Sequence, residues 1–596
     1  MSVLDRIERL RNVMEQQKID CYIIPTDDYH HSEYVGDYFK FREYITGFTG
    51  SAGTAVFTKD KAGLWTDGRY FIQAEAQLKG SGITLYKSGE SDVPTIEEFL
   101  KSELKEGDVL GFDGRTVTYA QGKRYCHIAD ENGASLKYGL DFAQTIWKER
   151  PEMSMESVFS LEDKDTGEKI GSKLERIREV MKENGCNAHV LSSLDDIAWL
   201  LNIRGNDIAY CPLVLSYAIV YNNSVELFAD IRKFSDDIIN LLAENQVKIY
   251  PYEDIYRKVS EMTSEDKLLL DSAIMNYSLY QAISKETVIV DKQNPEILMK
   301  SVKNETQAEN LRKAHLKDAV AHTKFMYWLK KNIGRVEITE LSASARLERL
   351  RAEQEHFLGP SFGPISAYGE HGAIVHYSAD EKSNVPLKEG KLFMTDTGGH
   401  YLEGSTDITR TVALGEVGNI EKEHFTLVAR AMLRLANTVF LYGCSGANLD
   451  CIAREVFWKE GLNFNHGTGH GVGYLLNIHE GPINFRWKEG ERPAPALEEN
   501  MVITDEPGIY IEGSHGIRLE NELLVRKTVK NEYGQFMNFE ILTYVPIDLD
   551  AILPEKMSTE EKEMLNHYHK QVYEKVSPYL SEEERIWLKE YTRAVK

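Results

Sequence analysis

Two aspartates in the second half of the sequence stand on either side of a glycine-rich segment. Asp396 ends one short run of apolar and β-branched residues, and Asp407 begins another. In a β-hairpin their carboxylates would lie on neighbouring strands, where mutual repulsion is costly unless a cation lies between them. This pair therefore indicates a metal site.

Residues 466–473, His-Gly-Thr-Gly-His-Gly-Val-Gly, are predicted to be extended. The four glycines among these eight residues would each cost a helix roughly 1 kcal/mol relative to alanine. In an extended chain His466 and His470 share one face, and the absent side chains let another backbone or a ligand approach closely. His470 is therefore a candidate metal ligand.

Two further carboxylates occupy strand and turn positions, Glu506 in Thr-Asp-Glu-Pro-Gly and Glu520 in Arg-Leu-Glu-Asn-Glu. Together with the aspartate pair they make four acids, whose formal charge balances two divalent ions, and a bridging hydroxide would be the extra nucleophilic ligand. The oxygen-rich set favours a hard ion such as Mn²⁺ over a structural zinc, which usually recruits thiolates. We therefore expect two divalent metal ions and hydrolytic chemistry.

The first half of the sequence contains an internal repeat. Residues 9–14 (Arg-Leu-Arg-Asn-Val-Met) recur as residues 176–181 (Arg-Ile-Arg-Glu-Val-Met), and each copy precedes a polar turn and a short apolar run. The apolar runs are residues 21–24 and 188–191. Because a helical pattern leads into a strand-like pattern in both copies, we predict two similar α/β domains in tandem.

A third, larger domain is predicted to begin with a long helix. Residues 304–331 contain neither Gly nor Pro and place apolar residues at helical intervals. Beyond Ser361, short β-branched runs separated by Gly, Asn and Pro are typical of an antiparallel sheet. Capping boxes that begin at Ser558 and Ser581 predict helices in the tail. We therefore predict α/β and α+β architecture with domains of residues 1–152, 153–302 and 303–596.

Composition limits the partners and the compartment. Asp and Glu total 94 against 70 Lys and Arg, a formal net charge of -24. Such a field repels phosphate backbones and anionic membrane surfaces, so neither nucleic acid nor a membrane is an expected partner. The six cysteines lack any Cys-x-x-Cys spacing, which argues against disulfides and thiolate zinc sites. With no signal-peptide pattern and no apolar run near the roughly 20 residues of a membrane span, we expect a cytoplasmic protein.

The order Asp, Asp, His, Glu, Glu, with the motifs at 466–473 and 504–508, resembles the metal-dependent pita-bread peptidases, which include methionine aminopeptidase, prolidase and X-Pro aminopeptidase. The similarity is greatest to the long, three-domain X-Pro aminopeptidases, also called aminopeptidase P, and covers essentially the whole chain. Residues 44–53, 372–377 and 479–482 also resemble that form. The resemblance implies two tandem creatinase-like α/β domains followed by a pita-bread metallopeptidase domain with a helical tail.

Carried over to this sequence, the resemblance also implies which residue holds which ion. Asp396 would hold one ion, and His470 and Glu506 would hold the other. Asp407 and Glu520 would bridge the two. All five ligand positions are filled.

The same resemblance assigns substrate binding and proton handling to His376, His466 and His479, and a proton shuttle to Glu506. The expected activity is removal of the first residue from peptides with proline in the second position, by attack of a dimetal-bound hydroxide. Two alternatives remain: a prolidase-like dipeptidase, against which the second N-terminal domain argues, and a peptide-binding relative that has lost turnover. A homodimer formed through the catalytic domain is also expected.

Overall fold

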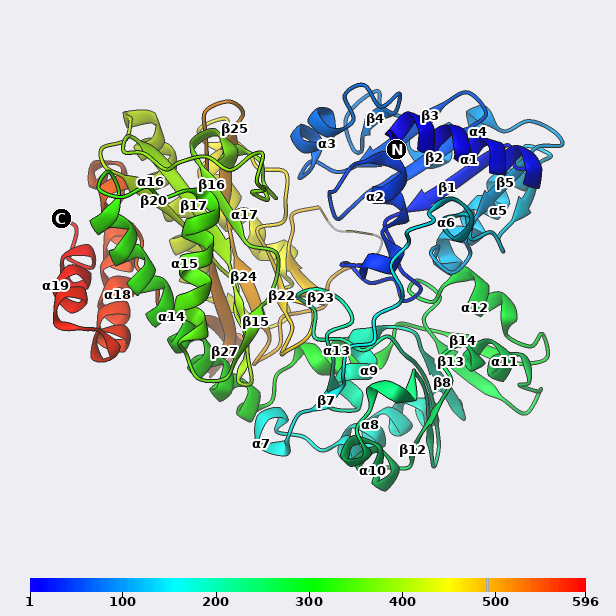
Figure 1. The fold of residues 1–596 in the computed structure, drawn as a ribbon. Helices are drawn as coiled ribbons and strands as arrows, with labels where there is room; N and C mark the ends of the chain where they lie inside the picture. The colour runs from blue at the N-terminus through cyan, green and yellow to red at the C-terminus, as the bar shows by residue number, and fades with distance from the viewer. Residues whose placement is uncertain (489, 491) are drawn as a thin grey trace. The chain divides into compact units, whose positions relative to one another are not determined.

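The computed structural model describes residues 1–488, 490 and 492–596, which form two compact units (Figure 1). Unit 1 comprises Met1–Leu161 and Glu168–Ile297, and unit 2 comprises Glu162–Gly167 and Leu298–Lys596. The predicted boundaries at 152/153 and 302/303 stay predictions. Within the described residues, none of the helices combines the length and the apolar character of a membrane span.

Unit 1 contains two six-stranded sheets of identical strand order. The first is β4-β3-β2-β1-β5-β6 and the second is β12-β11-β10-β8-β13-β14. Strand β1 is antiparallel to β2 and parallel to β5, and its counterpart β8 is antiparallel to β10 and parallel to β13. The strands of the first sheet are β1 (Cys21–Pro25), β2 (Thr54–Thr58), β3 (Ala62–Thr66), β4 (Thr84–Lys87), β5 (Val109–Phe112) and β6 (Ser135–Lys137). Those of the second are β8 (Ala188–Leu191), β10 (Tyr217–Tyr221), β11 (Val225–Phe228), β12 (Val247–Tyr250), β13 (Lys267–Leu270) and β14 (Val288–Asp291).

The repeat predicted from the sequence is confirmed, because each sheet is entered through a helix that leads into its central strand. Helix α1 (Val3–Gln17) precedes β1, and helix α8 (Ile170–Glu183) precedes β8. Both helices bury an apolar stripe, as period-3.6 patterning requires. The remaining helices of unit 1 include α2 (Phe41–Thr46), α3 (Phe71–Gln77), α4 (Ile96–Glu103), α5 (Tyr119–Glu131), α6 (Phe142–Ile146), α9 (Leu194–Leu200), α10 (Asp236–Glu244), α11 (Asp254–Ser260) and α12 (Tyr277–Ala282).

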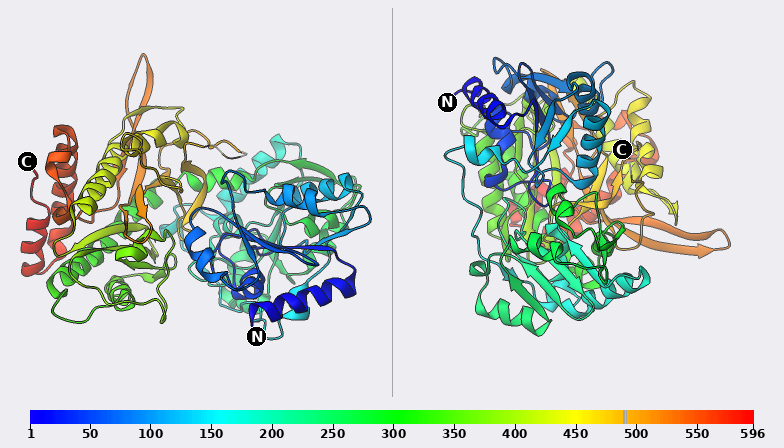
Figure 2. Two further views of the ribbon diagram at one scale, coloured as in Figure 1. Left: turned by 90° about the horizontal axis from the view of Figure 1, so that it is seen from above. Right: turned by 90° about the vertical axis from the view of Figure 1, so that its right-hand side faces the viewer.

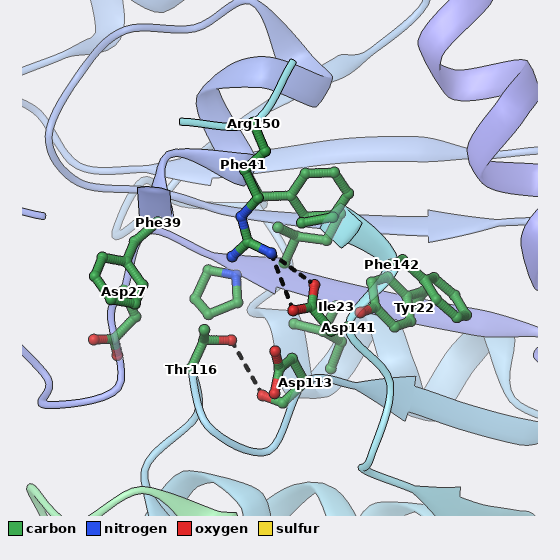
Figure 3. Close-up of a pocket in the computed structure, with 13 residues that line it drawn as sticks. Tyr22, Ile23, Asp27, Phe39, Phe41, Asp113, Thr116, Asp141, Phe142 and Arg150 are labelled. Atoms are coloured by element: carbon green, nitrogen blue, oxygen red, sulfur yellow. Dashed lines mark hydrogen bonds and ion pairs between the residues drawn. The ribbon is translucent and has the colours of Figure 1, made fainter. Parts of the chain in front are cut away.

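A small polar cavity of about 30 Å³ lies beside β1 in the first of these sheets. Figure 3 shows the Arg150 guanidinium against the Asp141 carboxylate, with Asp113 and Thr116 nearby. Arg150 donates to Asp141 at 3.0 Å, and Arg115 bridges Asp113 and Asp141 at 2.8 Å. The cavity has room for a water molecule but not for a peptide, and its ion pairs hold the segment around Arg150 against the first sheet.

The predicted long helix is present in unit 2. Helix α14 (Glu305–Asn332) starts at Asn304, whose side chain accepts from the Gln307 N–H in a capping box. The predicted caps Ser558 and Ser581 begin helices α18 (Thr559–Val576) and α19 (Glu582–Tyr591). The other helices are α15 (Glu340–Ala352), α16 (Asn419–Ala436) and α17 (Gly446–Trp458), together with the short α7 (Asp163–Thr166) and with α13 (Pro295–Ser301), which spans the boundary between the units.

Most of the acidic and histidine residues singled out in the sequence lie on strands of antiparallel sheets or next to their ends. A three-stranded sheet has the order β16-β17-β20, and a six-stranded sheet has the order β21-β28-β27-β24-β22-β23. The β27–β28 hairpin extends beyond the rest of unit 2 (Figure 2). The strands are β16 (Ile365–Tyr368), β17 (Lys391–Thr397), β20 (Ile408–Leu414), β21 (Phe440–Leu441), β22 (Gly469–Val472), β23 (His479–Phe485), β24 (Val502–Asp505), β27 (Asn521–Asn531) and β28 (Gly534–Ile541). A separate hairpin pairs β25 (Gly508–Ile511) with β26 (His515–Arg518).

One hydrophobic core joins these sheets to the helices of unit 2. It includes Phe325 of α14, Phe425 of α16, Phe457 of α17 and Ile503 of β24, all of them buried. Close packing of this kind leaves little freedom for backbone movement, so the strands hold their polar side chains on a rigid base.

Candidate metal centre

Three carboxylates meet where β17, β20 and β27 come together. Asp396 lies on β17, Asp407 directly precedes β20, and Glu520 directly precedes β27. The Thr409 hydroxyl donates to Glu520 Oε2 at 2.8 Å, and the Glu520 N–H donates to the Thr409 carbonyl at 3.1 Å. One ligand oxygen from each of the three carboxyl groups lies within 4.8 Å of the others. The predicted proximity of Asp396 and Asp407 is therefore correct, although β18 (Gly399–Tyr401) and β19 (Gly404–Ser405) replace a simple turn between them.

His470 faces this group from β22. Its Nε2 lies 3.5 Å from Asp407 Oδ2 and 3.8 Å from Glu506 Oε1. Its Nδ1 lies 2.8 Å from the Gly471 carbonyl oxygen, a contact that assigns the proton to Nδ1. The lone pair on Nε2 is thus directed at the carboxylates, as a metal ligand requires.

Glycine is required on both sides of His470 because neighbouring backbones lie too close for a side chain. A Cβ on Gly469 would lie 1.8 Å from the Thr504 carbonyl oxygen, and a Cβ on Gly471 would lie 2.2 Å from the Glu480 carbonyl oxygen. The His470 N–H also donates to the Thr504 hydroxyl at 3.1 Å. The predicted extended conformation is present over β22, and the absent side chains let β23 and β24 approach it.

The carboxyl groups of the site are buried and close together, so their negative charges need nearby cations. Burial, reinforced by the Asp396 charge, raises the pKa of Asp407 to about 7. Burial also raises the pKa of Glu506 and of Glu520. Among the residues that the structure describes, no donor satisfies the buried Oδ1 of Asp396. Four converging carboxylates and one imidazole nitrogen fit divalent ions, which would supply the missing charge.

Two of the three predicted substrate histidines border the carboxylates. His466 Nδ1 lies 3.8 Å from Glu506 Oε2, so His466 and His470 do share one face, as predicted. The His479 ring meets the His470 ring edge to face, with centroids 4.3 Å apart. His376 lies in the turn that follows η3 (Gly369–Ala373), and the carbonyl of its neighbour Val375 accepts from Arg518 at 3.3 Å.

Arg518 and Tyr510 belong to the site but were not singled out in the sequence. The buried Arg518 guanidinium pairs with Asp396 and donates to the Tyr510 hydroxyl at 2.7 Å. That hydroxyl lies 2.8 Å from His466 Nε2. Arg518 is the first residue of the Glu520 motif, whereas Tyr510 lies four residues after Glu506, just beyond the end of its motif. Four acids already balance two divalent ions in formal charge, so no charge signal in the sequence pointed to Arg518.

Glu522 lies in the same acidic run as Glu520 but acts through the backbone. Its Oε1 accepts from the Asp407 N–H at 2.7 Å, and its Oε2 lies 3.0 Å from His315 Nε2. All three residues are buried. Glu522 therefore fixes the Asp407 backbone from behind the carboxylate group.

Comparison with known families agrees with this architecture. Residues 309–527 match the metallopeptidase family M24, and residues 535–595 match the C-terminal region of that family. Residues 6–137 and 149–307 each match the creatinase/prolidase N-terminal domain. The predicted fold, with two creatinase-like domains before a pita-bread metallopeptidase domain, is confirmed.

Curated relatives match this chain along nearly their full length. Xaa-Pro aminopeptidase 1 of Dictyostelium discoideum is 36% identical over 97% of this chain and 94% of its own length. Aminopeptidase P1 of Arabidopsis thaliana is 34% identical over 99% of both chains.

Among solved structures, the X-prolyl aminopeptidase of Caenorhabditis elegans, described as a cytosolic enzyme with a di-nuclear active site, covers both chains completely with a TM-score of 0.95 and 33% identity. The Xaa-Pro dipeptidase of Bacillus anthracis, with a TM-score of 0.51 and 25% identity, covers only 64% of this chain. Identity at this level along the entire length shows that the chain belongs to the Xaa-Pro aminopeptidase family of M24 metallopeptidases.

Proposed function

We propose that this chain removes the first residue from peptides that carry proline in the second position. The proposed ligands of two divalent ions are Asp396, Asp407, His470, Glu506 and Glu520. The observation that carries the proposal is the overlap of the ligand groups. Asp396, Asp407 and Glu520 form one group, and His470, Glu506 and Glu520 form another. Because Glu520 belongs to both, and Asp407 lies 3.5 Å from His470, these two carboxylates are suited to bridge adjacent ions.

Two ions bound here would supply an activated water and would polarise the carbonyl that precedes proline. The chain's own residues handle the protons. Glu506, whose pKa is raised by burial, is suited to receive a proton at its carboxylate and pass it to the leaving nitrogen. His376 and His466 would stabilise the negative charge that develops on the carbonyl oxygen.

The hydrogen bonds of His466 fix the orientation of its ring. The Arg518 N–H donates to the Tyr510 oxygen, which leaves the Tyr510 O–H free to donate to His466 Nε2. Nδ1 lies 2.7 Å from the Gly467 carbonyl oxygen and therefore carries the ring proton. The Nδ1 edge of the His466 ring thus faces Glu506, whose Oε2 lies 3.8 Å from it.

A substrate with proline in the second position lacks one backbone N–H and brings a ring into the site. Its peptide nitrogen carries no hydrogen, so a proline-specific site needs a surface for the ring where other peptidases place a hydrogen-bond acceptor. The His479 ring borders the centre beside His470 and is the surface we assign to the proline ring.

Mn²⁺ is the ion we propose, because the ligand set is dominated by oxygen. The test is elemental analysis of the purified protein together with hydrolysis of Ala-Pro-Pro, each with and without added Mn²⁺. We expect two ions per chain and metal-dependent release of alanine. Full activity after removal of all metal would refute the proposal, and binding of metal without hydrolysis would favour the non-catalytic alternative.

A prolidase-like dipeptidase is the second candidate. The match to aminopeptidases over the whole chain, compared with 64% for the dipeptidase, favours the aminopeptidase. Ala-Pro and Ala-Pro-Pro assayed side by side separate the two. Cleavage restricted to the dipeptide would establish the prolidase activity.

A cytoplasmic homodimer is the proposed form of the enzyme. Unit 2 exposes large aromatic side chains, with Tyr533 at 75%, Trp487 at 45% and Trp458 at 42%. The Trp458 and Trp487 rings contact each other with centroids 5.8 Å apart. Exposed apolar groups of this kind favour an interface. Light scattering on the parent protein and on Tyr533→Asp tests this, and an unchanged mass for a dimeric parent would exclude Tyr533 from the interface.

A further inference from the structure

Lys303 is a buried cation in the short connection between helices α13 and α14. Its side chain is 1% exposed and pairs with Glu480, whose side chain is 3% exposed. The ammonium group also donates to the Lys300 carbonyl at 2.9 Å, and the Lys303 N–H donates to the Asn500 carbonyl at 3.1 Å. Lys303 therefore joins the start of α14 to β23 and to the turn before β24.

Glu480 immediately follows His479 on β23. Because successive side chains of a strand point to opposite faces, the Glu480 carboxylate lies behind the strand while the His479 ring lies in front, against His470. Glu480 is also opposite Gly471, the residue after His470. A Cβ on Gly471 would lie 2.2 Å from the Glu480 carbonyl oxygen, so the two backbones are in close contact at this point.

We propose that Lys303 is a positioning residue, which holds Glu480 and thereby fixes the His479 ring beside the metal centre. The inference rests on the proposed role of His479 in binding the proline ring. A buried carboxylate deprived of its cation must move toward water or become neutral, and either change alters the β23 backbone. A displacement of about 1 Å in a group that positions the substrate is sufficient to lower the reaction rate by up to about 100-fold.

The test compares Lys303→Met with the double variant Lys303→Met/Glu480→Gln. In the single variant Glu480 loses the ammonium group that pairs with it, and we expect KM for Ala-Pro-Pro to rise about 10-fold at unchanged metal stoichiometry. In the double variant the Glu480 charge is removed together with the Lys303 charge, and KM should return to within about threefold of the parent value. A purely structural role would reduce the amount of folded enzyme and lower the apparent kcat without changing KM.

Lys330→Met is the matched control, because the Lys330 side chain is only 8% exposed in unit 2 and pairs with Asp548 at 2.6 Å. It should lower the melting temperature and leave KM unchanged. An unchanged KM in Lys303→Met, or an equal rise in Lys330→Met, would overturn the inference. If Lys303→Met does not yield folded protein, Glu480→Gln tests the same contact, and an unchanged KM there would overturn the inference too.

His479→Ala separates this inference from the function on which it rests. If His479→Ala raises KM while Lys303→Met does not, only the positioning role of Lys303 fails. If His479→Ala leaves KM unchanged, the proposed role of His479 fails and the positioning role of Lys303 fails with it.

Discussion

The imidazole rings of His470 and His479 meet edge to face, with their planes at 87° to each other. They come from the neighbouring strands β22 and β23, on which Val472 opposes His479. The His470 ring directs Nε2 at Asp407 and Glu506, while the perpendicular ring borders the same group from the side. This arrangement suits the two proposed roles, because one imidazole can bind an ion while the other contacts the substrate.

Glu506→Gln tests the ligand and proton shuttle proposed for that residue. The amide keeps the size of the side chain but removes its charge and its capacity to receive a proton. We expect turnover of Ala-Pro-Pro to fall by about 100-fold or more, or metal content to drop below two ions per chain. Glu512→Gln, at an exposed position in the next hairpin, is the control and should behave as the parent. Near-normal turnover of Glu506→Gln would end the assignment.

His466→Ala should separate transition-state stabilisation from metal binding. His466 lies 3.8 Å from Glu506 and is hydrogen-bonded to Tyr510, whereas the ligand groups do not include it. We expect kcat to fall by about 100-fold while two ions per chain are retained. Tyr510→Phe, which removes only the hydroxyl, should cause a smaller loss. Loss of metal in His466→Ala would show instead that His466 supports the ligands.

Removal of the metal should make the stability of the protein depend on pH in a defined direction. Burial and the Asp396 charge raise the pKa of Asp407 in the fold from 3.8 to about 7. In the metal-free protein this contribution to stability is complete below about pH 4 and is lost as pH rises through about 7. Mn²⁺ binds the deprotonated carboxylates, so it should raise the melting temperature more at about pH 7.5 than at about pH 5.5.

The measurement is thermal unfolding of chelator-treated protein with and without Mn²⁺ at the two pH values. Asp407→Asn is the comparison, because the amide cannot titrate and should reduce the difference between them. Equal gains at both pH values in the parent protein would contradict a raised pKa of Asp407.

The features predicted correctly from the sequence are those that depend on neighbouring residues along the chain. The limits of α14, the caps of α18 and α19, and the repeat of α1 with β1 in α8 with β8 follow from periodicity and capping residues. The clustering of Asp396 and Asp407 followed from charge repulsion. In contrast, the pairs Arg518–Asp396 and Lys303–Glu480 join residues 122 and 177 positions apart. The periodicity of apolar residues along a helix or strand does not predict such contacts, because they depend on how distant segments are arranged in the fold.

Gly469→Ala tests the close approach of β22 and β24. A Cβ at this position would lie 1.8 Å from the Thr504 carbonyl oxygen, so the strands must separate. We expect a loss of at least about 1–3 kcal/mol in the free energy of unfolding, with weaker metal binding because His470 moves with its strand. Gly139→Ala is the control, since nothing lies within 4 Å of its Cβ position. Parent-like stability and metal content in Gly469→Ala would contradict the packing.

A buried ion pair in unit 1 should make that unit less stable in alkaline solution. His189 Nε2 lies 3.2 Å from Glu296 Oε2, and both side chains are fully buried. Burial lowers the pKa of His189, but the Glu296 carboxylate, the Leu269 carbonyl and Asp196 together raise it by more, so the pKa lies above its usual 6.5. The stability from this pair is complete below about pH 6.5 and is lost as pH rises through the raised pKa.

Hydrogen exchange of the β8 amides, followed from about pH 6 to pH 9 and corrected for intrinsic exchange, measures this loss. In the parent protein, protection of β8 should decrease as His189 loses its proton and leaves the Glu296 carboxylate buried without a cation. In Glu296→Gln the carboxylate is absent, so protection should be lower at pH 6 and nearly independent of pH. His127→Gln, on the exposed face of α5, is the control and should keep the parental dependence. The same pH dependence in Glu296→Gln as in the parent would exclude this pair as its source.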